Sequence, residues 1–116
     1  MLTEARTIKI LGTDVRVLCR KEAEDPKLKT CVGYYDASKS VIVVKILVPD
    51  ENSMGDLDKY QLEILRHEIL HAFLHESGLD CCSGSAENWA TNEEMVDWFA
   101  IQSPKIFKIF REQKLV

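Results

Sequence analysis

The sequence lacks several features that would assign a protein to a broad class. It has no run of about eighteen apolar residues that could span a bilayer, and its first residues lack the apolar core of a signal peptide. The fifteen Lys and Arg residues are scattered and the net charge is −4, whereas proteins that bind a nucleic-acid backbone cluster positive charge. We therefore expect a cytoplasmic protein with no nucleic-acid partner and no membrane partner.

Cysteine motifs are also missing. The four cysteines, Cys19, Cys31, Cys81 and Cys82, form no C-x-x-C pair of the kind that binds zinc. Cys81 and Cys82 are adjacent in a predicted loop, where they can be interpreted as a second metal site or a redox pair. Two free thiols in a reducing compartment are the simpler interpretation.

What is present is typical of a small globular domain. The chain has 116 residues, of which 46% are hydrophobic and 29% charged. This length allows one modest core and is too short for two. Since no internal repeat, low-complexity segment or linker interrupts it, residues 1–116 are predicted to form a single domain.

Alternating apolar and polar residues predict two N-terminal antiparallel hairpins. The first covers residues 7–20 with a turn at Gly12–Thr13, and the second covers 31–35 and 40–48 with a turn at 36–39. The charged stretch 21–29 between them is predicted to be a loop. Residues 41–48 are almost all aliphatic, which suits a strand covered on both faces or packed against a helix. That strand either offers a free edge to an extended peptide or belongs to the core of the sheet.

Two helical regions are predicted to follow. The first runs from about Asp56 to Ser77, with Ser53 or Asp56 as N-cap and Gly78 at its end. Its predicted apolar surface consists of Leu57, Leu62, Ile64, Leu65, Ile69, Ala72 and Phe73.

After a polar loop over residues 80–88, the second helix is predicted to begin near Thr91 or Asn92. Ser103–Pro104 is expected to interrupt it, with Pro104 in the first turn of a last short helix through Phe110. The predicted fold class is therefore α+β, with hairpins first and helices after them.

The first helix contains His67-Glu68-Ile69-Leu70-His71, an H-E-x-x-H motif. Residues four apart lie on one face of a helix, one turn apart, so both imidazoles can bind one Zn²⁺. Glu68 is then placed to reach a water molecule at the metal and act as general base. The alternative is that the two histidines are partly buried core residues and Glu68 is a surface charge. Burying all three without a metal is costly, which favours a zinc site.

A catalytic zinc usually has a third protein ligand. His75 lies about 12 Å along the helix axis from His67, too far for one ion, so it is assigned to the rim of the site. On the second helix, Glu93 borders the predicted inward face formed by Val96, Phe99, Ala100 and Ser103, and it is assigned as the ligand. Asp97 is expected to hold the free N–H of a ligating histidine. Glu94 stays as the alternative ligand, and an acidic first helical turn is the simpler explanation of all three carboxylates.

With His67-Glu68-x-x-His71-x-x-Leu74-His75 and Glu93-x-x-Val96-x-x-Phe99-Ala100, the chain resembles the ImmA/IrrE family of zincin-like metallopeptidases, in particular its short phage and prophage members. The resemblance covers about Leu65 to Ala100. It implies a small zincin-like fold with a sheet edge beside the H-E-x-x-H helix, and zinc held by two histidines and an acidic residue. It also implies a protein or peptide substrate, with a helix-turn-helix transcriptional repressor as one candidate.

The sequence therefore supports two functional hypotheses. In the first, the protein is a zinc endopeptidase with ligands His67, His71 and Glu93 and with Glu68 as general base; Tyr34, Tyr35, Tyr60 and His75 are candidates for stabilising the oxyanion. In the second, it is a phage accessory protein without activity, in which zinc is structural or absent. A partner protein would then bind the sheet edge or the region of Trp89 and Trp98. A fourth protein ligand from Cys81, Cys82 or His75 would support the second hypothesis.

Overall fold

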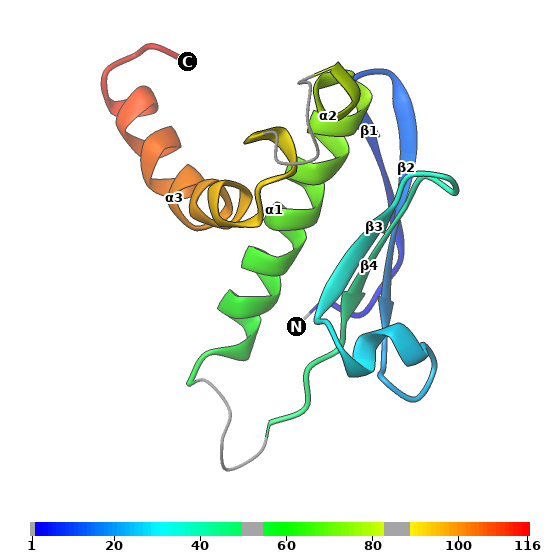
Figure 1. Cartoon of the computed structure of the whole chain (residues 1–116). Coiled ribbons are helices and arrows are strands. Elements are labelled where there is room, and N and C mark those ends of the chain that lie inside the picture. Colours follow the sequence, from blue (N-terminus) through cyan, green and yellow to red (C-terminus); the bar gives the residue numbers. More distant parts are fainter. Residues whose placement is uncertain (1, 50–54, 83–88) are drawn as a thin grey trace.

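The structure, a computed structural model, describes residues 2–49, 55–82 and 89–116. A four-stranded sheet is followed by helices, as predicted (Figure 1). The strands are β1 (Arg6–Ile10), β2 (Thr13–Arg20), β3 (Gly33–Asp36) and β4 (Val41–Lys45). The α-helices are α1 (Leu57–Glu76), α2 (Leu79–Cys82) and α3 (Glu93–Glu112), and two short 3₁₀ helices cover Pro26–Lys29 and Trp89–Thr91. No helix in this part of the chain is long and apolar enough to cross a bilayer.

Both predicted hairpins are confirmed. β1 pairs with β2 and β3 pairs with β4, in each case antiparallel. The first turn lies one residue earlier than predicted, at Leu11 and Gly12, which both adopt positive φ values of 48° and 90°. The expected loop over residues 21–29 instead ends in a 3₁₀ helix, because Asp25 caps it and Pro26 fits its first position.

The strand order decides between the two alternatives for residues 41–48. β2 and β4 pair in parallel, so the order is β1-β2-β4-β3 and β4 lies inside the sheet. β4 therefore has no free edge to offer a peptide. Its first four residues are buried, because α1 covers one face and the 3₁₀ helix with Leu28 covers part of the other. Within the described residues, the two edge strands of the sheet are β1 and β3. β3 pairs only with β4 and follows it at the end of the sheet.

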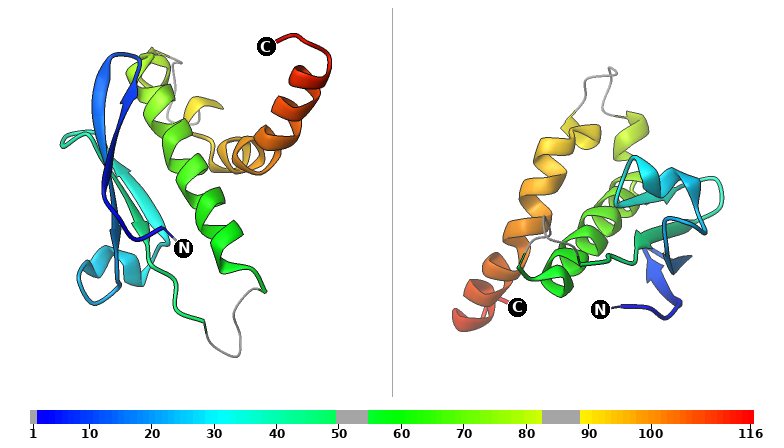
Figure 2. Two further views of the ribbon diagram at one scale, coloured as in Figure 1. Left: turned by 180° about the vertical axis from the view of Figure 1, so that it is seen from behind. Right: turned by 90° about the horizontal axis from the view of Figure 1, so that it is seen from below.

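α1 lies across one face of the sheet and completes the core (Figures 1 and 2). Asp56 caps it by accepting a hydrogen bond from the Lys59 backbone N–H, and Gly78 follows its end with a φ of 80°. The predicted N-cap Ser53 lies outside the described residues. Leu62 and Phe73 were expected in the core but are exposed, because no described element covers their side of α1. The main core cluster is Ile10, Val15, Val17, Ile42, Val44, Ile64, Leu65 and Ala72.

α3 packs on the side of α1 that faces away from the sheet (Figure 2). Asn92 caps its start, and Val96 and Ala100 are buried against α1. Phe99, predicted to face inward, is exposed. The predicted interruption at Ser103–Pro104 is wrong, since α3 continues through Pro104, although it changes direction in its middle (Figure 1).

The continuation of α3 through proline has a local explanation. Pro104 has no N–H and leaves the carbonyl of Ala100, four residues earlier, without its usual helical donor. The Arg66 side chain of α1 fills this role, because its Nε donates to the Ala100 oxygen at 2.6 Å. One hydrogen bond thus compensates the proline and holds α3 on α1.

Gly33 lets β3 approach α1 closely. A Cβ atom at this position would lie 2.7 Å from Cγ2 of Ile64 and 3.1 Å from the Val43 carbonyl oxygen. We predict that Gly33→Ala lowers the free energy of unfolding by about 1–3 kcal/mol, since β3 and α1 must separate to relieve the clash. Urea denaturation of both variants measures this.

The matched control is Gly55→Ala, because a Cβ at Gly55 meets no atom within 4 Å. Its free energy of unfolding should stay within about 0.5 kcal/mol of the wild type. Equal stability of the two variants would contradict the close approach of β3 and α1.

Candidate metal centre

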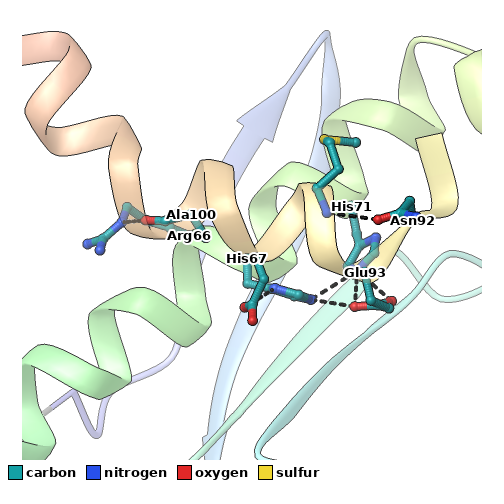
Figure 3. A network of polar contacts seen from close by, with 8 residues as sticks. Arg66, His67, His71, Asn92, Glu93 and Ala100 are labelled. Carbon is teal, nitrogen blue, oxygen red and sulfur yellow. Dashed lines mark hydrogen bonds and ion pairs between the residues drawn. The ribbon is translucent and has the colours of Figure 1, made fainter. Parts of the chain in front are cut away.

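Two histidines of α1 point their Nε2 atoms at the same place (Figure 3). His67 and His71 are one helical turn apart, and their Nε2 atoms are 3.1 Å from each other. Their side chains are largely buried, with 18% and 19% exposed. The i, i+4 spacing of the sequence therefore produces the convergence that zinc ligation needs.

α3 brings a carboxylate to the same place. Oε2 of Glu93 lies 2.9 Å from Nε2 of His67, and Oε1 lies 3.1 Å from Nε2 of His71 (Figure 3). Glu93 is the first residue of α3, and the Asn92 cap fixes the start and rotation of the helix through its bond to the Met95 N–H. Glu94, the alternative ligand, is exposed and has no contact with either histidine.

The spacing of these three donors fits a metal ion. Zn–N and Zn–O bonds of about 2.0–2.2 Å in a tetrahedron separate neighbouring donor atoms by about 3.3–3.5 Å. The closest nitrogen–nitrogen and nitrogen–oxygen distances here are 2.9–3.3 Å. Two imidazoles and one carboxylate are also a donor set that zinc accepts in catalytic sites.

Asp97 adds an independent argument for a cation. Its Oδ1 lies 3.1 Å from Nδ1 of His67, so Nδ1 is expected to carry the proton and donate to this carboxylate. Nε2 of a neutral His67 then presents a lone pair to the Glu93 carboxylate, which is repulsive. A cation among the three donors, or a proton on Nε2 of His67, would remove this repulsion.

Glu68 lies beside the donors and is deeply buried, with 5% of its surface exposed. Burial raises its pKa to about 7, with a smaller raising effect from Glu93 and a lowering effect from His67. His67, Glu68 and His71 form a group that can hold a metal ion. A carboxyl group with a pKa near neutrality can both accept and return a proton, which is the requirement for general acid–base catalysis.

Two hollows meet at this centre. The larger, of about 600 Å³, is lined by Tyr35, His71 and His75, and the smaller, of about 340 Å³, by Tyr60 and Asp97. Both hollows share five lining residues, which are Cys31, Gly33, His67, Glu68 and Glu93. The centre therefore lies where two parts of one groove join, between β3 and α3.

The other predicted residues occupy the larger hollow or its border. His75 bonds through Nδ1 to Oδ2 of Asp80 at 2.9 Å, and its ring meets the Tyr35 ring edge-on at 5.9 Å. The Tyr35 hydroxyl is buried and has no hydrogen-bond partner in the described part of the chain. The Tyr34 hydroxyl instead contacts Asp25, and burial together with this bond raises the pKa of Tyr34 to about 12. The side chains of Cys81 and Cys82 lie outside what the structure describes.

Two residues important for the geometry were missed by sequence reasoning. Asp80 was assigned to a polar loop but belongs to α2, where it holds His75. Arg66 was not considered, although it bonds to α3 directly beside His67. The position of Pro104 four residues after Ala100 was the available signal, because a carbonyl freed by proline needs another donor.

Glu93 and Glu94 differ only in position, so a matched pair of substitutions tests the assignment. We predict that Glu93→Gln weakens zinc binding at least tenfold, because it removes the negative charge that faces both histidines. Glu94→Gln should leave the zinc affinity unchanged. Titration of the metal-free protein with zinc against a competing chelator measures both, and the reverse order of effects would assign the ligand to Glu94.

Asp97 is predicted to act on zinc through His67. Asp97→Asn should weaken zinc binding about 10–100-fold, because an amide orients the His67 ring less strongly and no longer favours its Nδ1–H form. The change should not alter the free energy of unfolding of the metal-free protein beyond about 0.5 kcal/mol, since Asp97 is exposed. An unchanged zinc affinity would show that the contact with His67 is incidental.

Comparison with protein-family models, with curated proteins and with solved structures finds no match to the chain. The resemblance to ImmA/IrrE proteins rests on the motif residues in the sequence. The geometry of the His67, His71 and Glu93 donors is the observation from which a function is inferred.

Proposed function

We propose that the protein is a zinc-dependent metallopeptidase with a small zincin-like fold. The observation that carries this proposal is the meeting of three donors, from His67, His71 and Glu93, within 3.3 Å of one another beside the buried carboxyl group of Glu68. The group lies in an accessible groove, as a catalytic centre requires.

Zinc, when bound, supplies a Lewis acid that polarises a peptide carbonyl and activates water. Glu68 is the residue placed to take the proton of the attacking water and to pass it to the leaving amine. Its burial supports this role, because a carboxyl group with a pKa raised toward 7 releases the proton again readily. Asp97 keeps His67 oriented while this happens.

The groove suits an extended peptide. β3 ends the described sheet at this groove, and its backbone can pair with a substrate strand by β-augmentation. The two hollows, on either side of the centre, would take side chains from both sides of the cleaved bond. The sheet edge that the family resemblance implies is therefore supplied by β3 rather than by β4.

Tyr35 and His75 are the best candidates for stabilising the oxyanion. Both line the larger hollow, the Tyr35 hydroxyl is not satisfied by a described residue, and Asp80 orients His75. The Tyr34 hydroxyl is a weaker candidate because it already donates a hydrogen bond to Asp25. Among protein substrates, the family resemblance makes a helix-turn-helix repressor the first to test.

A second candidate function, as a protein-binding accessory protein with structural or no zinc, is favoured by one observation. Trp98, which belongs to the region proposed to bind a partner, is 55% exposed on α3. An exposed tryptophan is typical of interfaces. This observation does not involve the metal donors, so a binding role and a catalytic role are compatible.

Replacement of the general base tests the proposed activity. We predict that Glu68→Gln retains about one zinc per chain and lowers peptide hydrolysis about 10²–10⁴-fold, because the amide cannot accept a proton. Hydrolysis is measured with the zinc-loaded full chain on a peptide library, read by mass spectrometry. Glu94→Gln is the control and should keep full activity.

Two results would count against this function. Equal hydrolysis by wild type and Glu68→Gln would remove Glu68 from the reaction. Absence of hydrolysis by the zinc-loaded wild type on both the library and the repressor would favour the accessory function.

A further inference from the structure

Exposed large apolar side chains are concentrated at one end of the molecule. Of the twelve such residues in the described part of the chain, eight lie between residues 98 and 116. The four others are distributed over the β1–β2 turn, the segment after β4 and α1. A concentration of exposed apolar side chains in one segment points to an interaction site. The eight residues are Trp98, Phe99, Ile101, Phe107, Ile109, Phe110, Leu115 and Val116.

The apolar face of α3 extends beyond the body on which α3 packs. Val96 and Ala100, in its first half, are fully covered by α1. Phe107 and Phe110 follow at helical spacing but are 50% and 43% exposed. We refer to residues 104–112, the second half of α3, as the C-terminal arm. The arm lies on the side of α1 away from the sheet and points away from the body (Figures 1 and 2).

The segment 104–116, which contains the arm, differs in charge from the rest of the protein. Four of the fifteen basic residues, and one of the nineteen acidic residues, lie between residues 104 and 116. This segment therefore has a formal charge of +3, and the remainder of the chain has −7. The four basic residues are Lys105, Lys108, Arg111 and Lys114.

The basic residues border the apolar face on both sides. At about 100° per residue, Ile106, Phe107, Ile109 and Phe110 occupy a sector about 160° wide. Lys105 is next to Ile109 at one border and Arg111 is next to Phe107 at the other, where the Arg111 guanidinium lies 5.8 Å from the Phe107 ring centre. The single acidic residue, Glu112, lies on the opposite, polar face with Lys108, 3.9 Å from it.

We infer that the C-terminal arm binds the surface of an anionic lipid bilayer. An amphipathic helix with aromatic and aliphatic residues on one face and Lys or Arg at its borders places its apolar face among the acyl chains and its cations at the phosphates. The acidic body would be repelled by the same surface, and the projecting arm holds it at a distance. This inference concerns no metal donor and does not rest on the proposed peptidase activity.

A second copy of the chain is the weaker candidate for covering the arm. Binding of the arm to another body needs an apolar surface of similar size. Outside α3 and the C-terminus, the exposed apolar residues are Leu11, Val48, Leu62 and Phe73, which lie on separate elements or far apart on α1. Of the exposed apolar residues before the arm, only Trp98, Phe99 and Ile101 lie near one another in sequence. Two arms packed against each other would bring together two positively charged segments. A bilayer needs no preformed apolar groove.

The inference departs from the sequence-based expectation of no membrane partner. That expectation depended on the absence of an apolar run long enough to span a bilayer. A helix that lies in the interface between the lipid bilayer and water needs only one apolar face with basic residues at its borders. Such a helix contains no long apolar run, so the absence of a spanning segment does not argue against it.

Co-sedimentation with vesicles tests the inference. The zinc-loaded full chain is mixed with vesicles of phosphatidylcholine, or of phosphatidylcholine with about 30% phosphatidylserine. We expect binding to the anionic vesicles that is at least tenfold tighter than to the neutral ones and that weakens at higher salt. Equal binding to both vesicle types, or none to either, would overturn the inference.

Three variants separate the contributions of the arm. The double substitution Phe107→Ser and Phe110→Ser should reduce binding to anionic vesicles at least tenfold, as should the triple substitution Lys105→Gln, Lys108→Gln and Arg111→Gln. Leu62→Ser, at an exposed apolar residue of α1, is the matched control and should bind like the wild type. Circular dichroism checks that each variant stays folded. Wild-type binding by both arm variants would contradict the inference.

Sedimentation velocity without lipid measures the oligomeric state and so separates lipid binding by the arm from self-association. A monomer supports the arm as a lipid-binding element. A dimer that is lost in the Phe107→Ser and Phe110→Ser variant would overturn the inference and assign the arm to self-association.

Discussion

The mutual approach of two imidazole nitrogens and one carboxylate is the constraint on which the arrangement of the helices depends. These atoms lie within 3.3 Å of one another, and a neutral His67 held by Asp97 has a lone pair directed at Glu93. The Glu93 side chain is 71% exposed, but the two imidazoles are only 18% and 19% exposed, and a polar group that loses water needs a partner. A bound cation would change this repulsion into attraction and would join α1 to α3. The position of α3 and the proposed chemistry would then have a common cause.

The parts of the fold and site that could be predicted are those set by local periodicity. Alternation gave the two hairpins, and the i, i+4 spacing placed His67 and His71 on one face. The same helical period distinguished Glu93 from Glu94, because the buried Val96 and Ala100 define the inward face of α3. The hairpins and the common face of the two histidines could be predicted because a helix or hairpin fixes the relative directions of residues close in sequence, whereas the choice between Glu93 and Glu94 as ligand stays a prediction.

What could not be predicted depends on residues far apart in sequence. The parallel pairing of β2 with β4 moved the free edge from β4 to β3, and no local pattern encodes which strands become neighbours. Leu62, Phe73, Phe99 and Trp98 are apolar at helical spacing, yet they are exposed because no described element covers them. Hydrophobicity indicates that a side chain prefers burial, but it does not indicate whether another element of the same chain packs over that side chain.

Pro104 has a mechanical consequence for the proposed centre. Because Pro104 cannot donate to the Ala100 carbonyl, the Arg66 side chain of α1 donates to it instead. This hydrogen bond therefore links α1 to α3 at the point where the backbone hydrogen bonding of α3 is interrupted. Arg66 directly precedes His67, so the hydrogen bond that compensates the proline connects the bend of α3 to the turn of α1 that carries a proposed metal donor.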